Sequence, residues 1–219
     1  RKATPAEIAK MQAIVAAAMQ DGAMGLSTGL AYVPGTFTPT DEIVALARTA
    51  RDHGGIYISH MRDEGGGVLD SVKETIAIGE AAAIPVQISH HKVGGRKQFG
   101  QSVQSLALIA AARARGIDVT FDQYPYTASH TGLSLIFPRW AMADDKLNER
   151  LASAGQRREI KTGMLAFIDE RFGDDPARIQ LARCGHDPAL AGKTIADLLK
   201  AAGQPLTQSA AADMVIELQ

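Results

Sequence analysis

The chain has 219 residues, of which 46% are hydrophobic and 21% charged, as is usual for a globular domain with a sizeable core. A formal net charge of −1 gives no electrostatic reason to expect a nucleic acid or an anionic membrane as partner. The single cysteine, Cys184, excludes an internal disulfide and favours a reducing, cytoplasmic location, and no apolar run reaches the roughly 18 residues of a membrane span.

Helix and strand patterns alternate through the first half of the chain. The first helix is expected to begin with Thr4 as N-cap and Glu7 closing a capping box, and the second with Thr40 as N-cap. Strand then helix, repeated along the chain, predicts an α/β fold in which helices cover a parallel sheet. The expected helices span 4–22, 38–55, 67–83 and 102–116, and the expected strands span 23–30, 56–60, 84–92 and 117–126.

The rhythm changes after Tyr126. Helical segments follow, with no clear next strand before residues 178–184. This part of the sequence favours an insertion, or lid, in the fourth strand–helix connection.

Two of the expected strands end in the same tripeptide, Ile-Ser-His. Side-chain alternation sets His60 on one face of its strand, places His90 and Lys92 together on the later strand, and turns His91 the opposite way. Because the carboxyl ends of parallel strands meet at one edge of the sheet, we expect His60 and His90 to be neighbours at a site. Neutral imidazole binds zinc, but a catalytic zinc takes about three protein ligands, so the pair would be part of a metal site.

Other histidines have simpler interpretations. His91 is expected to pack toward a helix as a structural residue. Cys184 and His186 form a Cys-x-His pair, which by itself is weak evidence for a metal, and a partly buried thiol is the simpler expectation. A strand-end histidine can also be structural, so His60 and His90 could serve packing alone.

Four segments of the chain, taken together, point to a family. They read GAMGLSTGLAYVPG, GGIYISHMRDEG, PVQISHHKVGG and DQYPY, in that order. This pattern closely resembles the N-acyl-D-amino-acid deacylases (D-aminoacylases) of the metal-dependent amidohydrolase superfamily. The resemblance is strong from about Thr4 to Tyr126 and looser through HDPALAGKTIADLL.

The resemblance implies part of a (β/α)8 TIM-type barrel, with parallel strands and outer helices and a largely helical insertion after the seventh strand. IYISH matches the fifth strand, VQISHHK the sixth and DQYPY the seventh. The implied division is 1–126 for the central β/α units, 127–190 for the insertion or lid, and 191–219 for a return to barrel helices.

The resemblance also implies roles for four residues. His60 and His90 match zinc-binding histidines, Lys92 matches a position that meets the substrate carboxylate, and Tyr124 matches a substrate-side tyrosine. The implied activity is zinc-dependent hydrolysis of the amide bond of a small N-acyl-D-amino acid, with no nucleic acid or membrane as partner.

The chain also departs from the family pattern. It has no His-x-His motif, its only cysteine lies downstream of the histidines, and the general-base aspartate of the eighth strand has no counterpart. We therefore expect an internal part of such a barrel, about strands four to seven, that is inactive alone and holds zinc weakly. Exposed barrel edges would favour self-association.

Two alternatives remain open at this stage. One is another amidohydrolase reaction, such as cyclic-amide opening by a dihydropyrimidinase, hydantoinase or dihydroorotase. Those enzymes commonly carry a carboxylated lysine on the fourth strand, and AMGLSTGL contains no lysine. The other is a non-catalytic β/α module with structural histidines.

Overall fold

The computed structural model describes residues 2–219, which fold as two compact units. Unit 1 runs to residue 94 and continues from 98 to 125. Unit 2 comprises residues 95–97 and 126–219. All four strands lie in unit 1.

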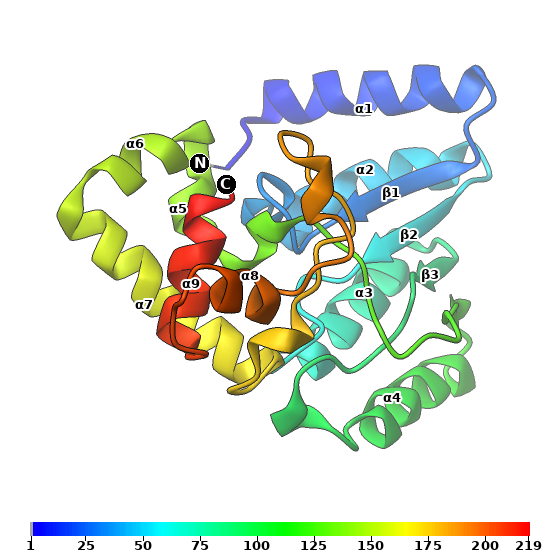
Figure 1. Cartoon of the computed structure of the whole chain (residues 1–219). Coiled ribbons are helices and arrows are strands. Elements are labelled where there is room, and N and C mark those ends of the chain that lie inside the picture. The colour runs from blue at the N-terminus through cyan, green and yellow to red at the C-terminus, as the bar shows by residue number, and fades with distance from the viewer. Residues whose placement is uncertain (1) are drawn as a thin grey trace. The chain divides into compact units, whose positions relative to one another are not determined.

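Unit 1 is a four-stranded parallel sheet in the order β1-β2-β3-β4, with helices between successive strands (Figure 1). The order of elements agrees with the sequence-based prediction. The strands are β1 (Gly25–Gly29), β2 (Ile56–His60), β3 (Val86–Ile88) and β4 (Val119–Phe121). The helices are α1 (Pro5–Gln20), α2 (Thr40–Asp52), α3 (Val68–Ala82) and α4 (Ser102–Ala114).

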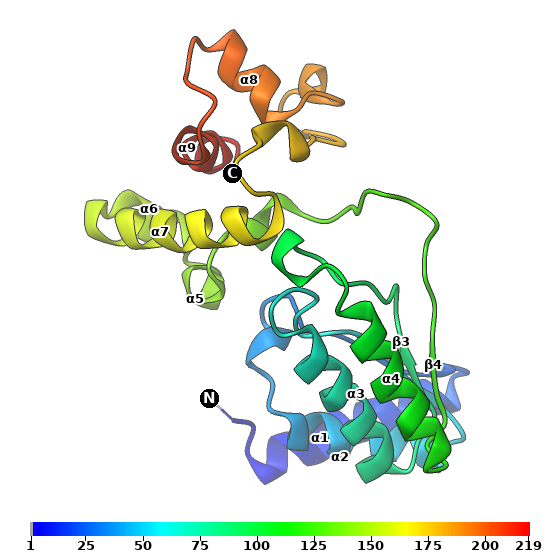
Figure 2. The same ribbon diagram turned by 90° about the horizontal axis from the view of Figure 1, so that it is seen from below.

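The main core of unit 1 lies between the sheet and its helices. Helix α2 packs on β1 and β2, α3 on β3, and α4 on β4; Figure 2 shows α3 and α4 running beside the strands. Helix α3 presents Val68, Val72 and Ile76 at four-residue spacing, and all three are buried. Tyr57 of β2 is fully buried on this side, and its hydroxyl lies 2.7 Å from the Thr28 hydroxyl. Burial raises the pKa of Tyr57, although hydrogen bonds with Ser59 and Thr28 oppose the rise.

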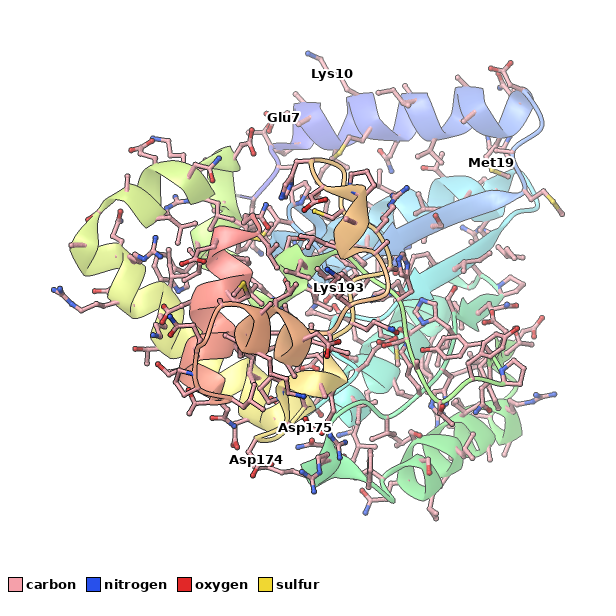
Figure 3. The ribbon with its side chains drawn as sticks, viewed as in Figure 1. Glu7, Lys10, Met19, Asp174, Asp175 and Lys193 are labelled. Carbon is pink, nitrogen blue, oxygen red and sulfur yellow. The ribbon has the colours of Figure 1, made fainter. Side chains whose placement is uncertain are left out.

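Helix α1 packs on α2 at the β1 side of unit 1. The capping box predicted at its start is present: Glu7 donates its backbone N–H to the Thr4 hydroxyl at 3.3 Å, and Thr4 donates its own to the Glu7 carboxylate at 2.8 Å. Met19, labelled at the far end of the helix in Figure 3, packs against the core beside Gly55.

The opposite face of the sheet is more open. Parallel pairing brings Ile58 level with Gln87, and Gln87 level with Thr120. Ile58 and Gln87 are half-buried and Thr120 is exposed, whereas their strand neighbours Tyr57 and Val86 are buried. His60 belongs to this open face by alternation with Ile58.

Three local predictions were wrong. Pro39 is the N-cap of α2 and Thr40 its first residue, because the Thr40 hydroxyl donates a hydrogen bond to Glu74 instead of capping the helix. The strands expected over 84–92 and 117–126 are much shorter, covering Val86–Ile88 and Val119–Phe121, and the chain turns directly after β3, where His90 has a positive φ. No strand forms over 178–184, where only a single antiparallel bridge joins Gln180 to Thr194.

Unit 2 is helical and has a core of its own. Its longest helix, α7, packs against α6 and α9, and α8 packs against α9. Helix α8 begins with a second capping box, in which Thr194 and Asp197 exchange hydrogen bonds. The helices are α5 (Arg139–Met142), α6 (Leu147–Ala152), α7 (Ala154–Arg171), α8 (Ile195–Ala201) and α9 (Gln208–Glu217). Within residues 2–219, no helix is both long enough and apolar enough to span a bilayer.

Candidate metal and substrate site

The site lies at the carboxyl ends of β2, β3 and β4 in unit 1. The loop after β2 is shaped by Asp63, whose carboxylate accepts the backbone N–H groups of Gly65 at 2.6 Å and Gly67 at 3.3 Å. The Asp63 N–H in turn donates to the Ser71 hydroxyl at 2.9 Å. This turn brings Glu64 back beside the strand end that carries His60.

The structure brings His60 and His90 together. Nδ1 of His60 lies 2.8 Å from Nε2 of His90, and the two rings meet edge to face with centroids 4.5 Å apart. They come from neighbouring parallel strands, as the order of strands predicted.

The reason for this proximity differs from the predicted one. Val86 and Ile88 face the helices, so simple alternation along β3 would send His90 into the core. Instead, His90 has a left-handed backbone with φ of 40°, which turns its ring toward His60. His91 takes the inward place: it is 5% exposed and packs against the ring of Phe121 at 5.2 Å.

Asp122, directly after β4, holds this turn. Its carboxylate accepts the backbone N–H of His90 at 2.6 Å, and its carbonyl accepts the N–H of His91 at 2.8 Å. The second carboxylate oxygen accepts the Gln87 side-chain amide at 2.6 Å. Three hydrogen bonds thus tie the end of β3 to the end of β4.

Glu64 is a site residue that the sequence did not single out. It is 8% exposed, and its Oε1 lies 2.6 Å from the Lys92 ammonium and 3.1 Å from Nδ1 of His90. The Lys92 ammonium also lies 2.9 Å from Nδ1 of His90 and donates to the His90 carbonyl at 3.1 Å. A partly buried lysine needs an acidic partner, but the sequence alone shows neither that Lys92 is partly buried nor that Glu64 is the partner.

Two tyrosines border the histidines. The ring of Tyr124 lies 6.4 Å from that of His90, and the Lys92 ammonium lies 5.5 Å from the Tyr124 centroid. The ring of Tyr32 lies 4.8 Å from that of His60. All four residues singled out in the sequence are therefore in one cluster, and Tyr32 is added to them.

The loop that carries Tyr32 is fastened to α3. Arg62 donates to the carbonyls of Thr36 at 2.7 Å and Thr38 at 3.0 Å, and its guanidinium pairs with both oxygens of Glu74 at 2.9 and 2.8 Å. Hydrogen bonds to Glu74 raise the pKa of Arg62, so the arginine stays charged.

The donor groups fit a zinc ion. Burial lowers the pKa of His60, and the charges of His90 and Lys92 lower it further against the opposing effect of Glu64. His60 is therefore neutral at pH 7, which is the form that binds metal. Adjacent ligand nitrogens around tetrahedral zinc lie about 3.3 Å apart. Nδ1 of His60 and Nε2 of His90, now 2.8 Å apart, would therefore have to separate only slightly to bind the ion. In the described residues, His60, Glu64 and His90 form the one group of three or more ligand-type side chains within 4.8 Å.

The Cys184–His186 pair lies in unit 2. The sulfur lies 3.4 Å from Nε2 of the imidazole, and both residues are at least partly exposed. Within the part of the chain that the structure describes, no third ligand-type side chain joins this pair.

The chain matches no family model. It is 48% identical over 133 residues to a D-aminoacylase of Alcaligenes xylosoxydans xylosoxydans, a match that covers 61% of this chain and 27% of that protein. It is 38% identical over 165 residues to an N-acyl-D-glutamate deacylase of the same organism, covering 75% of this chain and 33% of that one. The chain therefore spans about a third, or less, of these relatives.

Solved structures agree with the sequence relatives. A crystal structure of a D-aminoacylase, described as defining a novel subset of amidohydrolases, matches with a TM-score of 0.72 and 35% identity over 100% of this chain and 38% of its own. The N-acyl-D-glutamate deacylase of Bordetella bronchiseptica, solved with zinc and a phosphonate mimic of the tetrahedral intermediate, matches with a TM-score of 0.73 and 30% identity over 98% of this chain and 38% of its own.

In these structures the matched segment has the parallel sheet and outer helices seen here, and in this chain the sheet is not closed into a barrel. Over the part of their length that it spans, the chain is a homologue of the D-aminoacylases and N-acyl-D-glutamate deacylases and has their α/β amidohydrolase fold.

Proposed function

We propose that this chain is the part of a zinc-dependent N-acyl-D-amino-acid deacylase that supplies two of its metal-binding histidines. One observation carries the proposal: Nδ1 of His60 and Nε2 of His90 face each other at 2.8 Å at the carboxyl ends of adjacent parallel strands. Active sites of β/α barrels lie at this edge.

Each residue of the cluster has a distinct task in the proposed reaction. A bound zinc would supply Lewis-acid chemistry, by polarising the acyl carbonyl and making water a better nucleophile. His60 and His90 would hold the ion through neutral imidazoles. Lys92 would bind the substrate carboxylate as a point charge, with Tyr124 beside it. The group that accepts the water's proton is not among these residues, so we expect the chain by itself to be inactive.

Zinc binding by the chain tests this proposal. Purified chain is titrated with zinc against a chromophoric chelator, alongside His60→Ala, His90→Ala and the matched control His53→Ala, an exposed histidine at the end of α2. We expect weak binding that each site variant weakens further and the control retains. Equal zinc affinity in all four proteins would support purely structural histidines and overturn the proposal.

A test of the substrate class requires the whole protein, which is assayed with N-acetyl-D-amino acids, their L-enantiomers and a hydantoin. The deacylase proposal expects release of acetate from the D-forms. Ring opening of the hydantoin would favour a cyclic amidase, but β1 (Gly25–Gly29) carries no lysine that could be carboxylated.

We also retain two further proposals. The single cysteine, Cys184, supports a cytoplasmic location, because secreted proteins commonly rely on disulfides. The expected partner is a small N-acyl-D-amino acid, with neither nucleic acid nor membrane, in keeping with the net charge of −1.

A further inference from the structure

We propose that Glu64 is a positioning residue that selects the tautomer of His90 in which Nε2 is free to bind a metal. The inference rests on the proposed function only in naming Nε2 as the metal-binding atom. It concerns a hydrogen-bond choice that exists in the protein without any metal.

Two groups compete for Nδ1 of His90. The Glu64 carboxylate lies 3.1 Å from it and the Lys92 ammonium 2.9 Å from it. An ionised carboxylate can only accept a hydrogen bond, and an ammonium can only donate one. Nδ1 must therefore carry a hydrogen to bond Glu64, or present a lone pair to bond Lys92.

The two choices have opposite effects at Nε2. A neutral imidazole has one N–H, so an Nδ1 that accepts from Lys92 leaves the hydrogen on Nε2, where it points at His60. In that tautomer the lone pair is on Nδ1, and Nε2 has none to offer a metal. When Nδ1–H donates to Glu64, the lone pair is on Nε2, as in the carboxylate–histidine–metal arrangement of many metal sites.

The surroundings favour Glu64 as the partner of Nδ1. Glu64 is 8% exposed, and a buried carboxylate is strongly stabilised by each donor it gains. Lys92 already has two acceptors besides Nδ1: the Glu64 carboxylate at 2.6 Å and the His90 carbonyl at 3.1 Å. The loop position of Glu64 is also fixed, because its carbonyl accepts the N–H of Gly94 at 2.6 Å.

The same choice affects Lys92. An ammonium has three N–H groups, and Lys92 faces three acceptors, counting Nδ1 of His90. In the tautomer selected by Glu64, Nδ1 no longer accepts, so one N–H of Lys92 is released. That N–H is the one available to a substrate carboxylate, which couples the metal-competent state of His90 to the binding role of Lys92.

Nitrogen NMR of the metal-free chain, labelled with ¹⁵N-histidine, reads the tautomer directly. We expect His90 to carry its hydrogen on Nδ1 in the unaltered chain and on Nε2 in Glu64→Ala, where Lys92 is left as the hydrogen-bond partner of Nδ1 among the described residues. Lys92→Met is expected to keep the hydrogen on Nδ1. Hydrogen on Nε2 in the unaltered chain, or in Lys92→Met, would overturn the inference without any need for Glu64→Ala to fold.

Zinc titration gives a second readout. Glu64→Ala is expected to weaken zinc binding by about 10–100-fold, as losses of such outer partners do, and Lys92→Met to change it by less than about threefold. Asp70→Asn, which removes a carboxylate from the exposed Asp70–Lys73 pair, is the charge-matched control. A tautomer and a zinc affinity that are both unchanged in Glu64→Ala would refute the role. If Glu64→Ala switches the tautomer of His90 but His60→Ala leaves the zinc affinity unchanged, the role of Glu64 is upheld and the proposed function is refuted instead.

Discussion

At the scale of single residues, the site depends on an unfavourable backbone conformation at His90. A residue other than glycine in the left-handed region is strained by about 1–3 kcal/mol and persists only where its neighbours determine it. Asp122 is that neighbour, since its carboxylate accepts the N–H of His90 at 2.6 Å. The residue that holds His90 in this conformation therefore comes from the end of the next strand, β4.

Asp122→Ala tests this dependence. We expect unit 1 to lose about 1–3 kcal/mol of stability, the usual effect of removing a charged hydrogen-bond acceptor, and zinc affinity to fall by about tenfold or more. Asp122→Asn keeps an acceptor oxygen for the His90 N–H, so its stability and zinc affinity should lie between those of the unaltered chain and Asp122→Ala. Hydrogen exchange of unit 1 peptides measures the stability, because the only tryptophan, Trp140, lies in unit 2. Unchanged exchange at residues 86–92 in Asp122→Ala would contradict this role.

At the scale of elements, two features place the strand ends. The Arg62–Glu74 pair fastens the loop after β1 to α3, and it is largely screened from solvent, with 23% and 15% of the side chains exposed. The helix α3 itself lies against β3 at Gly79, where an added Cβ would meet Val86 Cγ1 at 2.7 Å. The ion pair thus holds the loop after β1, and the close packing at Gly79 holds the strand from which the loop carrying His90 begins.

Glu74→Gln should loosen the loop that carries Tyr32 and destabilise unit 1 by about 1–3 kcal/mol at pH 7, because it leaves Arg62 without its charged partner. Hydrogen exchange at residues 32–39 would rise. Lys73→Met, which breaks an exposed pair, should change stability by less than about 1 kcal/mol. Equal effects from the two variants would contradict this account.

The same pair predicts a pH dependence. Burial raises the pKa of Glu74, but hydrogen bonds from Arg62 and Thr40 and the charge of Arg62 outweigh it, so the pKa lies below its ordinary 4.5. The stabilisation is therefore fully present above about pH 4.5 and is lost as the pH falls through the lower folded value. Urea unfolding at pH 7 and pH 3 should show a smaller effect of Glu74→Gln at pH 3. An effect of Glu74→Gln of the same size at both pH values would contradict a stabilising ionised Glu74 carboxylate.

Gly79→Ala should destabilise unit 1 by about 1–3 kcal/mol, because Val86 has little room to move in a packed core. Gly155→Ala in α7 provides the contrast, since nothing lies within 4 Å of its added Cβ. Removing a helix glycine there should leave stability unchanged or raise it by up to about 1 kcal/mol. Melting temperatures of the two variants test this contrast. A lower melting temperature for Gly155→Ala together with an unchanged one for Gly79→Ala would contradict it.

At the scale of the whole molecule, the chain has two hydrophobic cores and a parallel sheet with open edges. In the described residues β1 pairs only with β2, and β4 only with β3. Unpaired strand edges associate readily, so we expect the chain to self-associate as its concentration rises. The implied division at residues 127–190 and 191–219 stays a prediction.

Sedimentation at increasing concentration measures this association. Thr120→Lys places a charge on exposed β4 and should shift the chain toward monomer, and Thr162→Lys on exposed α7 is the matched control. A chain that stays monomeric at about 100 μM, or one that responds equally to both substitutions, would contradict association through the edge.

Much of the fold followed from local pattern, and the finer geometry of the site did not. The strand Ile56–His60 was predicted to the residue, because its apolar run begins directly after Gly54-Gly55 and a polar, glycine-rich loop follows. β3 was predicted too long, because nothing in SHHK reveals that Asp122, more than thirty residues later, holds His90 in a turn. Glu64 lies in a glycine-rich loop without periodicity, so only its three-dimensional contacts with Lys92 and His90 identify it.

X-ray absorption at the zinc edge tests the central claim most directly, because it reports the atoms around the ion. Zinc added to the chain should show nitrogen neighbours at about 2.0–2.1 Å with the scattering of two imidazoles. His60→Ala and His90→Ala should each leave one imidazole, and His53→Ala should leave two. Zinc surrounded only by oxygen, or an imidazole signal that survives removal of both His60 and His90, would contradict a metal centre at these strand ends.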